Sequence, residues 1–375
     1  MKQHRRRPTV VRYLAAAAAA ALVVTACGAD EEVPEADPGA EAAEDPGEDP
    51  GEAAAANGEC EDWLDGRTGD FVVPYNPGGS TDPVGREYAT ALENHLGQQW
   101  AVDNVAGGGA TIGTSQILAG PADGSSLGLS SNTALAFQPL VNPDVPYDDA
   151  DDYTMIMKLV DLPAVLTVRA DAPWETIEEF LEAAEASPGE LTVSTSGNLT
   201  QPDQNILILN EEAGVELRNV PFSGGGGEAL TALLGGQVDA NMGYGPSILG
   251  QVEAGEIRPL GVVGDQEYHL FPDATPFGDL GFDVATPAWY GIVAPAGMDA
   301  DLVECIRELS MEAFTTPEIE EWAVSMGYNY DPVAGADAEA ELATYADEYQ
   351  RVLQEYGDLL DAPLAELEEE DEEEG

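Results

Sequence analysis

Lysine and histidine are nearly missing from this chain of 375 residues. It carries 13 Lys+Arg against 72 Asp+Glu, a formal net charge of −59, and its lysines are Lys2 and Lys158. Binding to a nucleic-acid backbone needs clustered basic residues, so this shortage argues against a nucleic-acid partner. The three histidines, His4, His95 and His269, disfavour a zinc site or a Ser-His-Asp enzyme. We therefore expect no metal, no cofactor and no catalytic residues.

A long apolar run is also missing, and the start of the chain has the organisation of a secretion signal. Basic residues at Arg5–Arg7 and Arg12 precede a run of fourteen residues, from Tyr13 to Ala26, which is shorter than the ~20 that span a bilayer. The run ends in Val-Thr-Ala before Cys27 and Gly28 and resembles a bacterial lipobox, which implies that Cys27 is diacylated. Acyl chains anchor a protein without a spanning helix. We therefore expect a signal peptide at 1–26 and a lipid-anchored, extracytoplasmic protein on the outer face of the cell membrane or in the periplasm; the alternative is an ordinary signal peptide.

Two acidic segments flank the expected folded region. Residues 27–65 are rich in Glu, Asp, Pro, Gly and Ala, and residues 366–375 are almost entirely acidic; such segments cannot bury a core, so we expect a disordered tether and a disordered tail. The region between them is acidic as well. At about 1 M salt the Debye length is roughly 3 Å, which screens such repulsion. The composition favours a halophilic host over an acidic protein from a moderate environment.

Cysteine is scarce too, which limits disulfides to few arrangements. After Cys27, the chain holds Cys60 and Cys305. In an exported protein two thiols often pair. We predict a Cys60–Cys305 disulfide, with two unpaired, mostly buried thiols as the alternative.

Short apolar runs alternate with helical patterns from residue 71 onward. This alternation is typical of α/β folds with parallel sheets. The expected strands are 71–73, 100–102, 127–129, 191–193, 217–220, 238–240 and 260–263, and the expected helices are 82–96, 113–118, 176–186, 204–212, 228–234, 248–254, 302–314, 319–326 and 338–353.

Five glycine- and hydroxyl-rich loops follow expected strands and lead into expected helices. Ligands of open α/β sheets bind in such loops, where glycine lets backbone N–H groups converge on an anion and a helix N-terminus adds positive charge. No GxxxxGK[ST] or GxGxxG motif is present, so a small carboxylate is favoured over a nucleotide. The loops are Pro74–Asp82, Asn104–Thr111, Ser130–Thr133, Ser194–Asn198 and Phe222–Gly227.

The first loop resembles the opening motif of a known receptor family. Pro74-Tyr75-x-x-Gly78-Gly79-Ser80-Thr81-Asp82-x-x-x-Arg86 is similar to that of the solute receptors of tripartite tricarboxylate transporters. Further family landmarks follow in order over about residues 66–335: Asn104 with Gly107–Gly113, Asp123-Gly124, Tyr147-Asp148, Tyr153–Ile156, Val220–Gly227, Leu233–Asp239, Ala254-Gly255, Arg258–Leu260, Pro272-Asp273 and Trp289–Gly297.

This resemblance implies a two-lobed periplasmic-binding-protein fold, each lobe a mainly parallel sheet flanked by helices. Lobe one comprises 66–164 and 287–365, and lobe two comprises 165–286. The implied function is to capture a small organic carboxylate between the lobes and deliver it to a membrane permease of one large and one small subunit. Alternatives are a receptor that presents its ligand to a sensor kinase and, less favoured, an extracellular enzyme.

The resemblance also implies a set of ligand-binding residues. Asp82 is more consistent with a helix cap than with an anion contact, and Asp239 could bind a ligand amine or hydroxyl or serve as a structural acceptor. Near the ligand, the order of Gly108 and Ala110 departs from the family pattern, and the histidine common near position 203 is replaced by Asp203. The implied residues are Tyr75, Asn76, Gly78, Gly79, Ser80, Thr81, Asp82, Gly108, Gly109, Ala110, Ser130, Ser131, Asn132, Ser196, Gly197, Thr200, Phe222, Ser223, Gly224 and Asp239.

Overall fold

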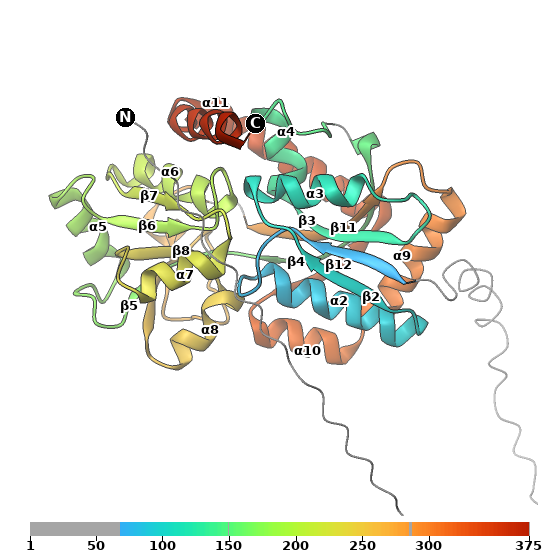
Figure 1. Ribbon diagram of the computed structural model, residues 1–375. Coiled ribbons are helices and arrows are strands. Elements are labelled where there is room, and N and C mark those ends of the chain that lie inside the picture. The colour runs from blue at the N-terminus through green and yellow to red at the C-terminus, as the bar shows by residue number, and fades with distance from the viewer. Residues whose placement is uncertain (1–67, 149, 285–286, 375) are drawn as a thin grey trace, which may run out of the picture. The chain divides into compact units, whose positions relative to one another are not determined.

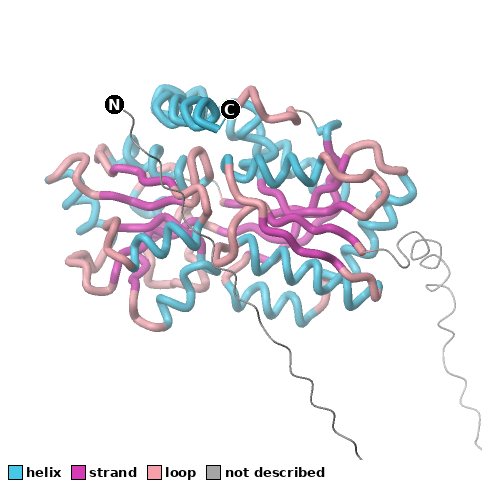
Figure 2. Tube along the Cα trace, in the orientation of Figure 1, coloured by secondary structure: helices cyan, strands magenta, loops and turns pink. Residues whose placement is uncertain are grey.

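The computed structural model describes residues 68–148, 150–284 and 287–374, with side chains up to 357. The predicted signal peptide, Cys27 and the predicted tether up to residue 65 lie outside this part of the chain. The described strands form two six-stranded sheets, each flanked by helices (Figures 1 and 2). The predicted two-lobed α/β fold is confirmed.

The first sheet has the strand order β12-β4-β11-β3-β1-β2. We call this sheet and its helices the first lobe. Its strands are β1 (Gly69–Val73), β2 (Trp100–Asn104), β3 (Ser126–Ser131), β4 (Tyr153–Leu162), β11 (Ala288–Pro295) and β12 (Asn329–Ala334), and its helices are α2 (Thr81–Leu96), α3 (Thr111–Leu118), α4 (Gln138–Val141), α9 (Ala300–Phe314), α10 (Pro317–Met326) and α11 (Gly335–Glu374), with short turns η1 (Gly108–Ala110), η2 (Thr133–Phe137) and η3 (Ala150–Asp152).

The second sheet has the order β10-β9-β5-β8-β6-β7 and, with its helices, forms what we call the second lobe. The chain enters it between Leu162 and Ala164 and leaves it between Pro276 and Ala288. Its strands are β5 (Ala164–Arg169), β6 (Thr192–Thr195), β7 (Arg218–Pro221), β8 (Ala240–Tyr244), β9 (Ile257–Val262) and β10 (Thr275–Pro276), and its helices are α5 (Ile177–Ala186), α6 (Gln201–Ala213), α7 (Gly226–Leu234) and α8 (Gly245–Glu253), with the turn η4 (Phe277–Leu280).

The expected helices follow their apolar spacing. In α2, Val84, Tyr88 and Leu92 recur at intervals of four residues and are buried, as an amphipathic helix requires. The helix ends at Gly97, whose φ of 70° gives the left-handed cap that glycine favours. The strand expected at 238–240 begins later than predicted, since the observed strand β8 starts at Ala240 and ends at Tyr244.

The expectation of mainly parallel sheets is met only in part. Of the ten pairs among the described strands, five are parallel and five are antiparallel. The antiparallel pairs involve β4, β5 and β11, the strands that carry the chain from one sheet to the other. In the second sheet, β5 is antiparallel to both of its neighbours, β8 and β9.

Helix α11 extends further than expected. Its backbone is helical to Glu374, through the segment for which the sequence predicts a disordered tail. Glutamate is a good helix former, and adding residues to an existing helix is much easier than starting one. Among the described residues, no helix combines the length and apolarity needed to cross a membrane.

Candidate functional site

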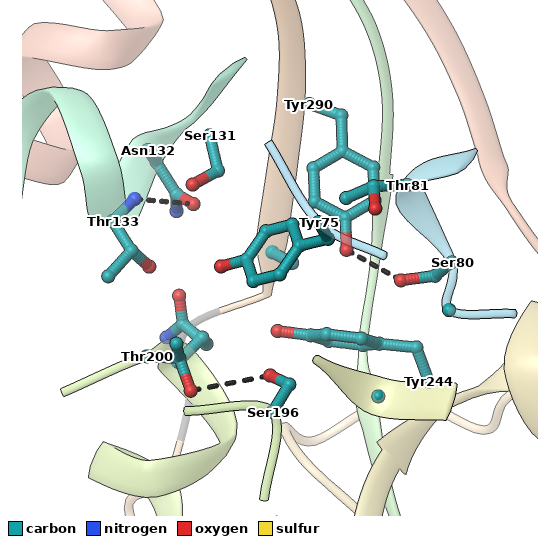
Figure 3. A pocket seen from close by; sticks show the side chains of 14 residues that line it. Tyr75, Ser80, Thr81, Ser131, Asn132, Thr133, Ser196, Thr200, Tyr244 and Tyr290 are labelled. Atoms are coloured by element: carbon teal, nitrogen blue, oxygen red, sulfur yellow. Dashed lines mark hydrogen bonds between the residues drawn. The ribbon is translucent and has the colours of Figure 1, made fainter. Parts of the chain in front are cut away.

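A pocket lies between the two lobes, at the ends of strands from both sheets (Figure 3). Arginine and lysine are absent from its described walls, which consist of small, hydroxyl-bearing and aromatic residues. The lining residues are Tyr75, Gly79, Ser80, Thr81, Ser131, Asn132, Thr133, Ser196, Thr200, Gln201, Gly226, Tyr244, Ala288 and Tyr290.

Four helices begin at this cavity. Ser80, Thr200 and Tyr244 are the N-cap residues of α2, α6 and α8, and Gly226 is the first residue of α7. None of these four N-termini has a side-chain cap among the described residues. Their first-turn N–H groups therefore lack the usual acceptor and add partial positive charge to the cavity. An anion can supply that acceptor.

Hydroxyl groups supply a second set of uncharged donors. Ser80 Oγ lies 2.7 Å from the Tyr290 hydroxyl, and Ser196 Oγ donates to Thr200 Oγ1 over 3.3 Å. The rings of Tyr244 and Tyr290 meet edge to face at 6.4 Å. Figure 3 shows the hydroxyls of Tyr75 and Tyr244 pointing towards Thr200 and its neighbours across the cavity. The site combines uncharged donors with aromatic surface and suits a small organic anion.

These phenols predict an alkaline limit to stability. Burial raises the pKa of Tyr75, Tyr244 and Tyr290 above the ordinary value of 10.0, and the bond from Ser80 lowers that of Tyr290 by less. The folded state therefore holds these protons more tightly than the unfolded state. The contribution of the three phenols to folding stability is complete below about pH 10 and is lost as the pH rises further. We expect the melting temperature to be level between pH 7 and 9 and to fall above pH 10. A decline that is complete by pH 9 would contradict this assignment.

Eight of the predicted ligand residues line the cavity. Seven of them come from three of the five predicted loops, and Thr200 follows the loop Ser194–Asn198 by two residues. Their role as ligand contacts stays a prediction. They are Tyr75, Gly79, Ser80, Thr81, Ser131, Asn132, Ser196 and Thr200.

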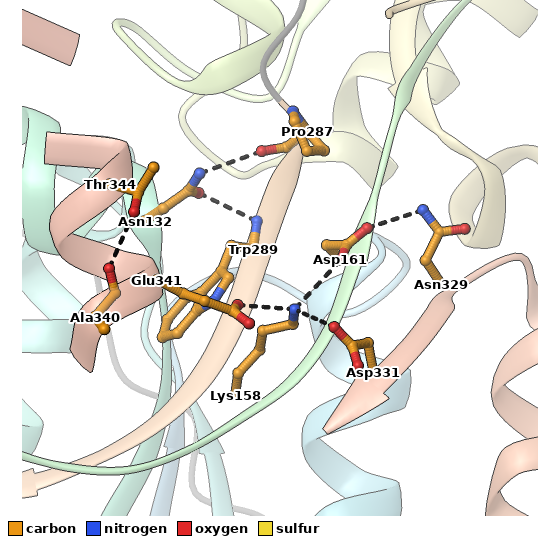
Figure 4. Close-up of polar contacts among 10 residues, drawn as sticks. All are labelled: Asn132, Lys158, Asp161, Pro287, Trp289, Asn329, Asp331, Ala340, Glu341 and Thr344. Atoms are coloured by element: carbon orange, nitrogen blue, oxygen red, sulfur yellow. Dashed lines mark hydrogen bonds and ion pairs between the residues drawn. The ribbon is translucent and has the colours of Figure 1, made fainter. Parts of the chain in front are cut away.

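The side chain of Asn132 is largely engaged within the protein. Its Oδ1 accepts from the backbone N–H of Trp289 and Thr133, and its Nδ2 donates to the Pro287 carbonyl (Figure 4). Residues 287–289 lie where the chain returns from the second lobe to the first. Asn132 thus ties the cavity wall to this crossing.

Asp82 does not cap its helix, contrary to expectation. The N-cap is Ser80, and the Asp82 carboxylate accepts from Arg86 Nε over 2.9 Å and from Asn104 Nδ2 over 2.8 Å. Asn104 Nδ2 also donates to the carbonyl of Tyr75 over 2.7 Å. Asp82 is therefore part of a network that fixes the backbone of the Tyr75 loop, and it does not line the cavity.

Asp239 serves as a structural acceptor, one of the two readings that the sequence leaves open. Its Oδ2 accepts from the backbone N–H of Thr192 over 2.9 Å and from the Thr192 hydroxyl over 2.8 Å. The bonds join the start of β6 to the approach to β8. Asp239 does not line the cavity.

The loop at 107–110 lies beside the cavity but does not line it. Gly107, Gly108, Gly109 and Ala110 all have positive φ values, from 56° to 128°. A Cβ at Gly109 would approach the backbone oxygen of Asn198 in the second lobe to 3.1 Å. The loop brings the lobes into close contact.

The remaining predicted residues form the rim or the second layer. Gly78 meets Gly227 across the lobes, where a Cβ on Gly227 would lie 2.9 Å from the Gly78 carbonyl carbon. Asn76 and Gly224 face each other at the same rim, and Ser130 is buried with its hydroxyl 2.9 Å from Thr114 Oγ1. Outside the cavity lining are Asn76, Gly78, Asp82, Gly108, Gly109, Ala110, Ser130, Gly197, Phe222, Ser223, Gly224 and Asp239.

Six lining residues are absent from the predicted set. Gly226 belongs to a predicted loop, and Gln201 directly follows the predicted Thr200. Tyr244 stands before Gly245 and Pro246 at a strand–helix junction of the kind that marks the other loops, so the same signal could have found it. Thr133 ends the predicted loop Ser130–Thr133, and Tyr290 lies within the family landmark Trp289–Gly297, whereas Ala288 carries no sequence signal.

One of the two cysteines of the predicted disulfide is described. Cys305 is buried in α9 and is disulfide-bonded, whereas Cys60 lies outside the described residues. That these two cysteines pair with each other stays a prediction.

Two lobes around a cavity into which helix N-termini point define a solute-binding protein of the periplasmic type. The family described as "Tripartite tricarboxylate transporter family receptor" matches residues 84–354. The chain belongs to this family, as the resemblance predicts.

Three similar proteins illustrate the relationship. Protein BugT of Bordetella pertussis is 30% identical over 284 residues, which are 75% of this chain and 86% of BugT. The structure of R. palustris Rpa4515 with adipate is 24% identical with a TM-score of 0.74, covering 78% of this chain and 98% of that one. MatC (Rpa3494) from Rhodopseudomonas palustris with bound malate is 23% identical with a TM-score of 0.68, covering 79% and 100%. The two structural likenesses support the fold.

Proposed function

We propose that the protein is a lipid-anchored, extracytoplasmic receptor that captures a small organic carboxylate between its lobes and delivers it to a tripartite tricarboxylate-type permease. The observation that carries the proposal is the cavity where, within the described part of the chain, four helices begin without side-chain caps and no arginine or lysine lines the wall. Backbone N–H groups and hydroxyls are the donors that remain for an anion.

The chemistry of the cavity favours a carboxylate. Neutral donors can compensate a carboxylate with two to four hydrogen bonds to each group, whereas sites for phosphate commonly add Lys or Arg. Rpa4515 with adipate and MatC with malate bind small dicarboxylates on the same fold.

The lipid anchor and the delivery to a permease are inferred from the sequence and the family, and not from the cavity. Acylation rests on the residues that precede Cys27, and delivery rests on membership of a transporter receptor family. A receptor for a sensor kinase would bind its ligand in the same way, so uptake of labelled ligand in cells with and without the permease genes distinguishes these two roles.

An enzymatic role has little support in the structure. Gly124-Ser-Ser-Leu-Gly128 has the spacing of a GxSxG motif, which in hydrolases places its serine at an exposed strand-to-helix turn. Here Ser126 is the first residue of β3, is buried and donates to the Ile117 carbonyl. Recovery of unchanged ligand after long incubation would separate a receptor from an enzyme.

Loss of two hydroxyls from the first lobe tests the site. We expect Ser80→Ala combined with Thr81→Ala to weaken carboxylate binding by about 1–3 kcal/mol, because donors to a buried charge are removed. The affinity is measured by calorimetry at high salt, with the ligand chosen by a thermal-shift screen of di- and tricarboxylates, amino acids and aromatic acids.

The matched control removes two hydroxyls that do not line the cavity. Ser325 and Thr344 are exposed on α10 and α11 and bond only to carbonyls of their own helices. Their joint change to alanine should leave the affinity unaltered. Equal affinities of the wild-type protein and the Ser80/Thr81 variant would remove the cavity as the carboxylate site.

A further inference from the structure

Helix α11 contacts the second lobe, although it follows the last strand of the first sheet (Figure 1). The Tyr349 hydroxyl donates to Gln201 Oε1 over 3.0 Å, and the Tyr356 hydroxyl donates to Glu212 Oε1 over 2.8 Å. Both acceptors belong to α6. The two tyrosines are seven residues apart and so lie on the same face of α11, which bridges the lobes.

Tyr349 is fully buried beside the cavity. Its ring packs against Phe137 with centroids 5.1 Å apart, and its hydroxyl lies 3.3 Å from Thr133 Oγ1. A phenol has one proton, and because Tyr349 gives it to Gln201, Thr133 is the donor in the second bond. Thr133 and Gln201 line the cavity from opposite lobes, so one phenol joins two of its walls.

The side-chain amide of Gln201 has a donor, Nε2, that is not engaged by Tyr349. The side chain is 2% exposed and stands at the first position of α6. Its Oε1 is engaged by Tyr349, and among the described residues Nε2 has no hydrogen-bond partner. Gln201 lines the cavity, so this donor is open to whatever occupies it. Within this cavity, a ligand oxygen is the acceptor that can satisfy it.

We propose that Tyr349 is a positioning residue for the ligand: by holding Oε1 of Gln201 it turns Nε2 towards the bound carboxylate. Tyr349 and Gln201 belong to different lobes, so the bond exists only while the lobes are together, and closure and ligand orientation support each other. This inference rests on the proposed carboxylate-binding function. Burial raises the pKa of Tyr349, so its proton is retained at neutral pH.

The test removes the hydroxyl alone, in the full chain. The probe is adipate or malate, whichever the wild-type protein binds more tightly. We expect Tyr349→Phe to raise the Kd roughly tenfold, mainly through faster dissociation, because the amide loses its fixed orientation. Tyr356→Phe makes the same change on the same helix away from the cavity, and we expect less than a twofold effect.

A double-mutant cycle separates positioning from general packing. If Tyr349 acts through Gln201, Tyr349→Phe should have almost no effect on the Kd in the Gln201→Ala background. Additive effects, or equal effects of Tyr349→Phe and Tyr356→Phe, would overturn the proposal. If neither acid binds the wild-type protein while other classes of molecule do, the carboxylate function fails. In that case the positioning role is tested by hydrogen exchange of residues 199–206 in the ligand-free protein. We expect Tyr349→Phe to speed this exchange, and unchanged exchange would overturn the positioning role.

Discussion

Gly227→Val is expected to weaken ligand binding by roughly 30- to 150-fold while both lobes remain folded. A Cβ at position 227 would lie 2.9 Å from the carbonyl carbon and 3.0 Å from the oxygen of Gly78. These are backbone atoms of the opposite lobe, so no flexible side chain can move aside. Overpacking of this kind is unfavourable by about 2–3 kcal/mol, and the penalty falls only on the arrangement in which the lobes meet. A variant that cannot bring its lobes together loses part of its ligand contacts.

A second glycine provides the control for this experiment. Gly250 lies within α8, and a Cβ there would meet no atom within 4 Å. Gly250→Val should therefore leave the Kd within twofold of the wild-type value. Calorimetry gives the affinities, and small-angle scattering with and without ligand gives the compaction. Normal affinity and normal compaction in Gly227→Val would show that binding does not require the contact with Gly78.

The sequence located the loops of the site better than the residues that face the cavity. Glycine- and hydroxyl-rich junctions at Gly79–Thr81, Ser131–Asn132 and Ser196–Thr200 do reach the cavity. Whether a side chain faces the cavity depends on its neighbours, as at Asp82, whose carboxylate is held by Arg86 and Asn104. Such long-range pairs leave no pattern in the local sequence.

The fold shows the same division between local and long-range signals. The helix at Thr81–Leu96 was predicted because its apolar spacing is local. Strands β4, β5, β11 and β12 are absent from the strands expected from the sequence. In β11 every residue is buried, so the alternation that marks a half-buried strand is absent. Each of the five antiparallel pairs contains at least one of these unpredicted strands, so no expectation for their pairing direction came from the sequence.

Lys158→Met is expected to lower the free energy of unfolding by about 3 kcal/mol. The Lys158 side chain is 4% exposed, and its Nζ lies 2.9 Å from Glu341, 3.1 Å from Asp331 and 3.5 Å from Asp161 (Figure 4). These carboxylates belong to α11, β12 and β4, so one ammonium group joins three elements of the first lobe. Removing a buried partner leaves like charges facing each other, which typically lowers the free energy of unfolding by about 3–5 kcal/mol. The carboxylates are partly exposed, which favours the lower end of that range.

The ammonium group of Lys158 stays charged well above neutral pH. Burial acts to lower the pKa of Lys158, but the hydrogen bonds that its ammonium group donates to Glu341 and Asp331 outweigh it, and the pKa is raised above the ordinary value. Because the pKa is raised, the contribution of Lys158 to stability is complete below its pKa in the unfolded state, about 10.4. It is lost only as the pH rises through its pKa in the folded state. The loss in Lys158→Met should accordingly be the same at pH 7 and pH 9. It should also persist in molar salt, because buried pairs are screened much less than exposed ones.

Arg351→Met separates burial from charge as the cause. Arg351 also contacts several acids, with Glu348 at 2.5 Å and Glu355 at 2.9 Å, but its side chain is 39% exposed. Exposed pairs contribute about 0–1 kcal/mol, so we expect a small loss that salt reduces. Urea unfolding at low and high salt measures both variants. Adding Glu341→Met to Lys158→Met should recover part of the lost stability, because fewer unpaired carboxylates remain. Equal losses for Lys158→Met and Arg351→Met would mean that the cluster around Lys158 behaves as a surface ion pair and does not hold α11 to the sheet.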